Sequence, residues 1–276
     1  MIDNLEATLN RLVAFSSTES SLDAAVDLQN IALALEAAEK IPVLTETCMS
    51  LCVDLLENTP LTTVTTYSIL MLLARCCMRE ENKELASRFG VFGLCVLILQ
   101  DYKKLSKDTL FASFDLISTL AMNDGNTRRM MRPAIPHVIN VMRDNKDSLK
   151  LAFGGAAVIS TLTMLDVANA ILAAECECFQ LLINFFLMAY EKKKQLLSQH
   201  ASRLSWNRKE EELLLLCDNV IYWTRDALQK LVLAPSSVID EKLEAATFGD
   251  YGTSVEVDEL KWKLKFDRKK VKLTTP

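Results

Sequence analysis

The 276-residue chain has few of the residues that form turns, with only 7 Gly and 6 Pro. An all-β sandwich or barrel needs a turn about every 8–12 residues, so this scarcity excludes that class. Half of the residues are hydrophobic, which is enough to bury a core and excludes disorder over most of the chain. Because Leu, Ala, Met and Glu are abundant, the sequence predicts an all-α fold.

The chain also lacks the usual catalytic and metal-binding motifs. Its two histidines, His137 and His200, stand in no catalytic spacing, and there is no P-loop, G-x-S-x-G or G-x-G-x-x-G. Cys176 and Cys178 form a C-x-C pair, but zinc sites usually need a second such pair. We therefore expect no enzyme, no cofactor and no metal site.

The N-terminal residues 1–12 show no basic region followed by an apolar core, as a secretory signal would. The most apolar stretches, residues 91–99 and 178–189, are too short to span a bilayer as helices. Most of the eight cysteines stand among apolar residues, where reduced thiols act as small hydrophobic groups. We expect a cytoplasmic protein, with a cytoskeletal or ciliary assembly as the alternative setting.

A net charge of −5 argues against nucleic-acid binding by the bulk of the chain. The charge is nevertheless segregated near the C-terminus. Residues 260–276 carry seven basic residues and one acidic residue, for a net +6, whereas residues 236–259 carry a net −6. A basic surface near the C-terminus is therefore a separate candidate for binding.

Three segments repeat one pattern at offsets of 44 and 42 residues. They read LLARCCMREENK at 72–83, LISTLAMNDGNT at 116–127 and VISTLTMLDVAN at 158–169. Each is followed by a new apolar helix after a short break. Weaker copies stand at 25–32 and 213–221. A unit of this length with two or three amphipathic helices has the armadillo or HEAT size. An ordinary helical bundle with accidental similarity is the alternative.

The chain resembles armadillo repeat proteins over roughly residues 5–232. In that family the last helix of a repeat is similar to A-W-A-L-S-N-L-A and the next repeat opens with G-A-I-P. Residues 25–32 read AVDLQNIA and residues 134–136 read AIP. The resemblance implies an α-solenoid over residues 1–234, with about four full repeats and one partial repeat. Such a solenoid buries its core between neighbouring repeats and is a right-handed superhelix.

The resemblance also implies which residues face the concave groove. The family's conserved Asn falls on Asn30, Arg75, Thr119, Thr161 and Asn219. The family's groove Trp, four residues earlier, falls on Val26, Met71, Asp115, Ala157 and Leu215. Nuclear-import adaptors use arrays of Trp and Asn, so their near absence here disfavours that function. We predict partner contacts at six ladder residues: Asn30, Arg75, Asp115, Thr119, Thr161 and Asn219. Merely solvated side chains are the alternative for any one of them.

The last repeat contains an insertion near residues 188–212. It has no Gly or Pro, which predicts one or two long helices beyond the stack. Tyr190 and Trp206 stand in this polar stretch. Trp206 is predicted to be a partner anchor, and docking back on the solenoid is the alternative.

Residues 235–276 are predicted to form a linker and a basic tail. Leu260, Trp262, Leu264 and Phe266 alternate with lysines, a period of two that predicts an extended strand. An isolated strand is unstable in water, so this tail would order on a surface: its own solenoid, a partner protein or an anionic lattice. The tail residues predicted to bind are Lys261, Trp262, Lys263, Lys265 and Phe266. A flexible terminus, or contact with an anionic membrane or nucleic acid, remains open.

Together these features predict a non-enzymatic protein-binding module, an adaptor or scaffold subunit. It would bind a protein segment along the concave face and through the tail. One alternative is a structural subunit of a large cytoskeletal or ciliary assembly. Two others are an enzyme or enzyme-regulating lid, and a peripheral membrane adaptor that uses the basic tail.

Overall fold

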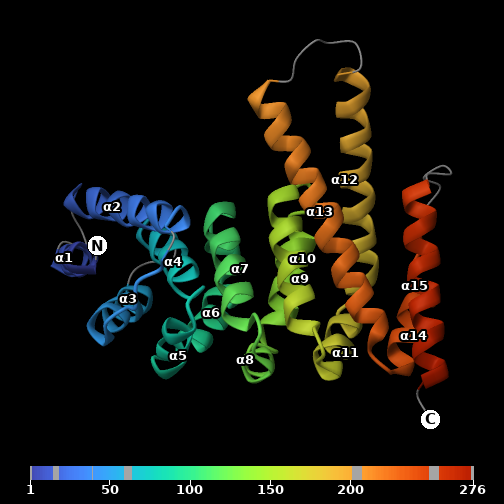
Figure 1. Cartoon of the computed structure of the whole chain (residues 1–276), viewed down its shortest axis with the longest axis horizontal. Helices are drawn as coiled ribbons and strands as arrows, with labels where there is room; N and C mark the ends of the chain where they lie inside the picture. The colour runs from blue at the N-terminus through green and yellow to red at the C-terminus, as the bar shows by residue number, and fades with distance from the viewer. Residues whose placement is uncertain are drawn as a thin grey trace. The chain divides into compact units, whose positions relative to one another are not determined.

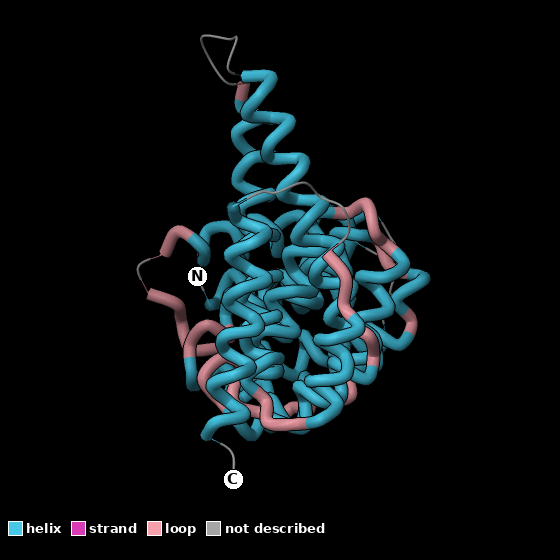
Figure 2. The backbone as a smooth tube through the Cα atoms, turned by 90° about the vertical axis from the view of Figure 1, so that its right-hand side faces the viewer, coloured by secondary structure: helices cyan, strands magenta, loops and turns pink. Residues whose placement is uncertain are grey.

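The computed structural model of the protein describes residues 2–14, 19–38, 40–58, 64–200, 207–248 and 255–274. These residues form fifteen α-helices and one short 3-10 helix, and Figure 2 shows no strand in the described part of the chain. The all-α prediction is therefore confirmed. The chain divides into two compact units, residues 1–137 and 138–276.

The first unit contains α1 (Ile2–Ala14), α2 (Glu19–Glu36), α3 (Glu46–Asn58), α4 (Val64–Cys76), α5 (Glu80–Arg88), α6 (Val91–Gln100), η1 (Tyr102–Lys104), α7 (Lys107–Ala121) and α8 (Gly125–Met130). Helix α9 (Ala134–Asp144) starts in the first unit and ends in the second. The second unit continues with α10 (Leu149–Thr163), α11 (Val167–Glu175), α12 (Cys178–His200), α13 (Arg208–Leu233), α14 (Ser237–Ala245) and α15 (Val255–Thr274).

Short polar side chains start several of these helices. Ser106 caps α7 by accepting a hydrogen bond of 3.1 Å from the Thr109 amide, and Ser148 caps α10 in the same way. At α13, Asn207 and Glu210 form a reciprocal capping box. Gly90, directly before α6, adopts a φ of 75°, which glycine tolerates without strain. The helix-breaking glycine and the capping side chains therefore stand in the turns that precede these helices.

In the first unit, α4 lies between α2 and α7, and these three helices follow one another in a layer (Figure 1). Helix α4 is buried on several sides, including polar positions such as Thr66 and Ser68. The Ser68 hydroxyl accepts a hydrogen bond of 3.0 Å from Gln29 on α2. A second layer of α1, α3, α5 and α6 covers the other side of these helices. Each helix of the first layer thus buries its apolar residues only because its neighbours are present.

In the second unit, α13 is the central helix and contacts α10, α12 and α15. Helices α12 and α13 run side by side, and their far ends extend past the end of α10 (Figure 1). Lys193 of α12 and Asp218 of α13 form an ion pair of 2.6 Å across them. The described residues of the predicted insertion therefore belong to two long helices.

The predicted strand in the tail is wrong, because residues 255–274 form the helix α15. The alternating pattern placed Trp262 and Phe266 on one side of a strand with Leu260 and Leu264, but in the helix Trp262 and Phe266 are 62% and 38% exposed. The buried residues are Val257, Leu260 and Leu264, whose spacings of three and four match a helix face. The tail was expected to order on a surface, and the chain's own helices were one of the possibilities. In the structure α15 packs on α13, and α14 packs on α11 and α13.

No single helix among the described residues is long and apolar enough to cross a membrane. Helices α11 and α12 reach the required length and hydropathy only when they are taken together across a bend of 78°.

A buried asparagine connects three segments of the first unit. Asn82, near the start of α5, has no exposed surface. Its side-chain oxygen accepts a hydrogen bond of 2.7 Å from the Leu44 amide. Its nitrogen donates to the carbonyl oxygens of Cys76, at 2.8 Å, and Pro42, at 2.9 Å. These bonds satisfy backbone groups at the end of α4 and in the loop before α3.

A buried asparagine binds the end of the preceding helix in the second unit too, but at a position that differs from the one the sequence repeat predicts. Asn169 stands three residues after the N-cap Asp166 and donates to the Leu162 carbonyl at 2.8 Å. Asn82 stands three residues after the N-cap Arg79. The sequence repeat pairs Asn82 with Asn126 instead, but Asn126 is exposed. The N-caps Arg79 and Asp124 stand 45 residues apart, so Thr127 and not Asn126 takes the place of Asn82 in α8.

We predict that Asn82→Ala lowers the free energy of unfolding by about 2–4 kcal/mol, because a buried amide and carbonyl lose their partners. Urea denaturation would measure the change. The matched control is Asn126→Ala, which alters an exposed asparagine and should change stability by less than about 0.5 kcal/mol. Equal effects of the two substitutions would contradict the connecting role of Asn82.

Candidate partner-binding surface

The ladder residues of the first unit lie on the three consecutive helices α2, α4 and α7. Asn30 is on α2, Arg75 on α4, and Asp115 and Thr119 on α7. The side of α2, α4 and α7 that carries these residues is named the ladder face. Residues that are 85 positions apart in sequence, Asn30 and Asp115, thus belong to one layer of helices.

A row of ion pairs crosses the ladder face. The Arg75 guanidinium lies 3.3 Å from the Asp115 carboxylate and 3.6 Å from that of Glu36, at the end of α2. The side chain of Glu36 is 57% exposed, whereas those of Arg75 and Asp115 are 23% and 31% exposed. The row therefore joins three helices and presents charge of both signs to solvent.

The Asp115 carboxyl group lies in an environment that disfavours its charge. Burial raises its pKa, Arg75 acts in the opposite direction, and the nearby negative charge of Glu36 raises the pKa further. A half-buried carboxylate of this kind is stabilised mainly by its one cationic neighbour. Arg75 consequently holds both acids of the row in place.

The remaining ladder residues differ in accessibility. Asn30 is exposed and Asn219 on α13 is half-buried. Thr119 and Thr161 are only 8% and 7% exposed. The two threonines have little surface to offer a partner, whereas Asn30, Arg75 and Asp115 can be reached from solvent.

A second polar cluster joins α10 and α13 in the second unit. The Lys230 ammonium lies 2.7 Å from both the Ser160 hydroxyl and the Asp226 carboxylate, and Ser160 also donates to Asp226. These hydrogen bonds fix α10 against α13.

The predicted tail residues occupy two faces of α15. Trp262 and Phe266 are exposed and stack with ring centroids 4.8 Å apart. The Lys270 ammonium lies 4.6 Å from the Phe266 ring centroid. Lys263 pairs with Asp267 at 3.0 Å on the same helix. Exposed aromatic side chains beside cations are typical anchors of protein interfaces.

Lys261 and Lys265 lie on the other face of α15, which turns toward α14. Trp206, the predicted anchor of the insertion, lies outside the described residues. Tyr190 of α12 donates a hydrogen bond of 3.0 Å to Glu256 of α15. This aromatic residue of the insertion therefore docks on the C-terminal helix.

A buried arginine fixes α15 to the second unit. Arg268 is 6% exposed and donates to the Asp240 carboxylate of α14 at 2.7 and 2.9 Å. It also donates to the carbonyl oxygens of Val232, Ala234 and Ser236, at the end of α13 and just after it. The last carbonyls of a helix have no partner within it, so Arg268 supplies their missing donors.

The cysteines give no sign of reactive thiolates. All eight are free, seven are buried, and Cys176 is half-buried. Burial raises the pKa of Cys77 and of Cys95 to about 12. Because the thiolate is the form that ligates metals and attacks substrates, such thiols are inert near neutral pH. The described part of the chain contains no group of three or more His, Cys, Asp or Glu side chains placed to hold a metal ion.

The fold is similar to that of engineered repeat proteins. A designed armadillo repeat protein superimposes with a TM-score of 0.64, at 14% identity, over 98% of this chain and all of that one. The chain has an armadillo-like helical repeat fold. An engineered protein of known structure matches equally well, with a TM-score of 0.64 at 14% identity over 97% of each chain.

Another designed armadillo repeat protein, solved in complex with the peptide (KR)4, matches with a TM-score of 0.63 at 13% identity. That match covers 97% of this chain and 99% of the other. No protein-family model matches the chain, and no curated protein matches it significantly. The sequence-based recognition of armadillo-like repeats and of an all-α solenoid is thus confirmed at the level of the fold.

Sequence reasoning missed several residues that shape these surfaces. Glu36 ends α2 outside the repeated segments, so nothing marked it as the partner of Arg75. Asp226 and Lys230 stand four residues apart on α13, a spacing that predicts an ion pair on a helix. Arg268 was one basic residue among seven in residues 260–276, and only its burial distinguishes it.

The attachment of α15 should depend on pH through Asp240. Its hydrogen bonds to Arg268, and then to Lys272, lower the pKa of the Asp240 carboxyl to about 2. A carboxyl group with a lowered pKa stabilises the fold above its unfolded pKa, and this contribution is lost as pH falls toward the folded value. We predict that amides of α15 lose protection against hydrogen exchange between about pH 4 and about pH 2.

The control is Asp240→Asn, whose α15 should be less protected than that of the wild type at neutral pH. The difference between the two proteins should shrink as the pH falls through the same range, after correction for intrinsic exchange rates. A difference that stays constant with pH would show that Asp240 does not hold α15 through its charge.

Proposed function

We propose that the protein is a non-enzymatic protein-binding subunit, an adaptor or scaffold, that holds a partner segment across the ladder face. The observation that carries the proposal is the row formed by Glu36, Arg75 and Asp115 on three consecutive helices. A partner that lies across these helices would meet an acid, a base and an acid in turn. Such alternation fixes the register of a bound segment through charge complementarity.

The comparisons support binding of this general kind. One designed armadillo protein with a similar fold was solved with a peptide whose name gives alternating lysine and arginine. In this chain, Glu36 and Asp115 are acids that a basic or polar segment could meet on the ladder face. The positions of the groove Trp hold no Trp, and only Asn30 and Asn219 stand at the positions of the conserved Asn, which disfavours a nuclear-import cargo as the proposed partner.

Helix α15 is the second part of the proposed binding surface. Trp262 and Phe266 form an exposed aromatic stack beside Lys270. Aromatic residues lose little conformational entropy on binding and bury a large area, so they dominate the binding energy of many interfaces. The proposed subunit therefore contacts partners with one surface in each unit.

Exchanging the charges of one pair tests the role of the ladder face. The double substitution Arg75→Glu with Asp115→Lys keeps the net charge but reverses the field that a partner would meet. We expect recovery of ladder-face partners by affinity capture from native cells to fall about tenfold, as mispaired interface charges cost binding energy. Quantitative mass spectrometry of the captured proteins would measure the change.

The matched control exchanges an exposed pair that lies away from the ladder face. Arg88 on α5 and Glu46 on α3 lie 2.5 Å apart, and Arg88→Glu with Glu46→Lys makes the same kind of exchange. This control should leave partner recovery unchanged, and thermal unfolding would show that both variants remain folded. Equal partner recovery by the two folded variants would refute binding at the ladder face.

A further inference from the structure

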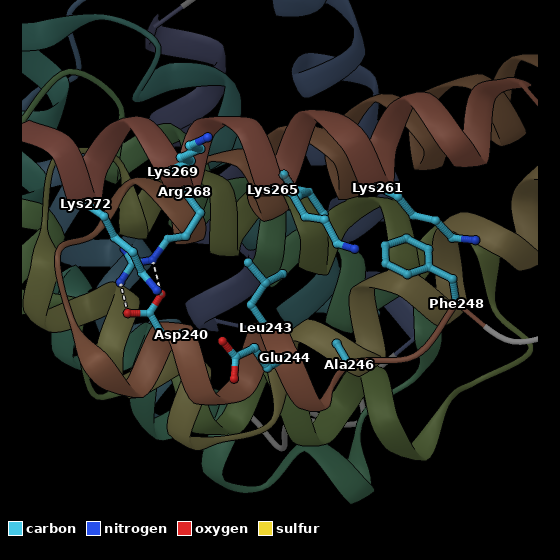
Figure 3. A pocket seen from close by; sticks show the side chains of 11 residues that line it. Asp240, Leu243, Glu244, Ala246, Phe248, Lys261, Lys265, Arg268, Lys269 and Lys272 are labelled. Atoms are coloured by element: carbon cyan, nitrogen blue, oxygen red, sulfur yellow. Dashed lines mark hydrogen bonds and ion pairs between the residues drawn. The ribbon is translucent and has the colours of Figure 1, made fainter.

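A cavity of about 690 Å³ that opens to solvent lies between helices α14 and α15 of the second unit. Its apolar lining includes Leu243 of α14, Leu264 of α15 and Phe248, which follows α14. In Figure 3, Leu243 lies between the two helices, and the charged side chains extend along both edges. The cavity is therefore apolar at its floor and charged at its rim.

One end of this cavity is neutralised by its own residues. Asp240 binds Arg268 at 2.7 and 2.9 Å and Lys272 at 3.0 Å (Figure 3). These bonds use the carboxylate on two cations and hold α14 against α15. A ligand at this end would have to break an ion cluster, so this end is structural.

The other end carries an excess of positive charge. Figure 3 shows Lys261 and Lys265 reaching from α15 toward Phe248, and the Lys261 ammonium lies 5.3 Å from the Phe248 ring centroid. Lys265 is exposed and pairs with no acid among the residues that the structure describes. Glu244 is the acid that α14 contributes to this end of the lining. Lys261 also lies 3.8 Å from the exposed Asp258 carboxylate on the same helix, outside the cavity lining. Within the lining at this end, the ammonium groups of Lys261 and Lys265 face the single carboxylate of Glu244 above an apolar floor.

The size of the cavity and its apolar floor favour an acidic peptide over a free phosphate or a membrane surface. A free phosphate would meet the lysines but leave the floor of Leu243 and Leu264 unused. A membrane surface is too broad to enter a cavity between two helices. The helix from Lys261 to Lys272 spans about 16 Å, at 1.5 Å for each residue. An extended peptide of about five residues covers the same length.

We propose that the cavity between α14 and α15 binds a short acidic peptide segment that carries a large apolar side chain. Its carboxylates would pair with Lys261 and Lys265, and its apolar side chain would lie on Leu243, Leu264 and Phe248. This inference rests on the proposed function, since it names the chemistry of a partner at the α15 surface. It assigns that partner to the face of α15 that turns toward α14, which is distinct from the face of the Trp262 and Phe266 stack.

Selection from a library of random peptides displayed on phage, with the full chain as bait, tests the proposal. Enriched sequences should combine Asp or Glu with Leu, Ile or Phe. The affinity of one enriched peptide, measured by fluorescence anisotropy, should fall at least about tenfold in the double variant Lys261→Glu with Lys265→Glu. Raising the salt from about 50 mM to about 500 mM should also weaken binding, since exposed charges are screened.

The matched control makes the same charge change elsewhere in the second unit. Lys146→Glu with Lys209→Glu alters two exposed lysines that do not line the cavity, and it should leave peptide affinity within about twofold of the wild type. Equal losses in the two variants would show a general charge effect and would overturn the proposal. Replacing the apolar residue of the peptide with serine should also abolish binding, because the floor then has no partner.

Other results separate the proposal from its alternatives. Selection that yields no enriched peptide, or yields basic or uncharged ones, would overturn it. Binding of a single-stranded RNA or of phosphatidylserine vesicles that displaces the peptide and is lost in the Lys261 and Lys265 variant would assign the cavity to those ligands instead. Loss of cellular partners on substitution of Trp262 and Phe266, with no acidic peptide bound, would refute the cavity site but keep the proposed function.

Discussion

The structure depends on burial that no repeat can achieve alone. Helix α4 has nine of its thirteen residues buried, and α2 and α7 cover it from opposite sides. Removing either neighbour would expose an apolar face of α4 to water, at a cost of roughly 25 cal/mol for each Å². The stack must therefore form as a whole, and this is why consecutive helices hold Glu36, Arg75 and Asp115 close enough to pair.

Two buried polar side chains, Asn82 and Arg268, bind the backbone at the ends of α4 and α13. Asn82 binds the backbone at the end of α4 and in the loop before α3. Arg268 binds the end of α13, and with Asp240 it converts the charged C-terminal segment into a docked helix. Because each replaces water at backbone groups that would otherwise be unsatisfied, neither tolerates a smaller side chain without loss. Arg75 of the ladder face directly precedes Cys76, whose carbonyl Asn82 binds, and the proposed cavity lies beside Arg268.

The helical repeat could be predicted from sequence because helix periodicity is local and recurs, as the copies at 116–127 and 158–169 show. The site was only partly predictable. Arg75 and Asp115 were expected from the repeat pattern, but their pairing with each other and with Glu36 depends on packing between helices. Residues 260–266 were misinterpreted as a strand because Trp262 and Phe266 happened to alternate with lysines. Their exposure follows from contacts of Val257, Leu260 and Leu264 with distant parts of the chain, which no short window contains.

The central claim is that a partner segment lies across the ladder face. Site-specific photo-crosslinking in cells tests it most directly, with a benzophenone amino acid placed at Val26 or Asn30 on α2, or at Leu97 on α6. The side chain of Val26 is 44% exposed and that of Leu97 is 57% exposed. Greater exposure to solvent would therefore not explain crosslinks that form from Val26 and not from Leu97. The account predicts that crosslinks to a partner protein form from Val26 and Asn30 and not from Leu97. Crosslinks that form from Leu97 alone would contradict it.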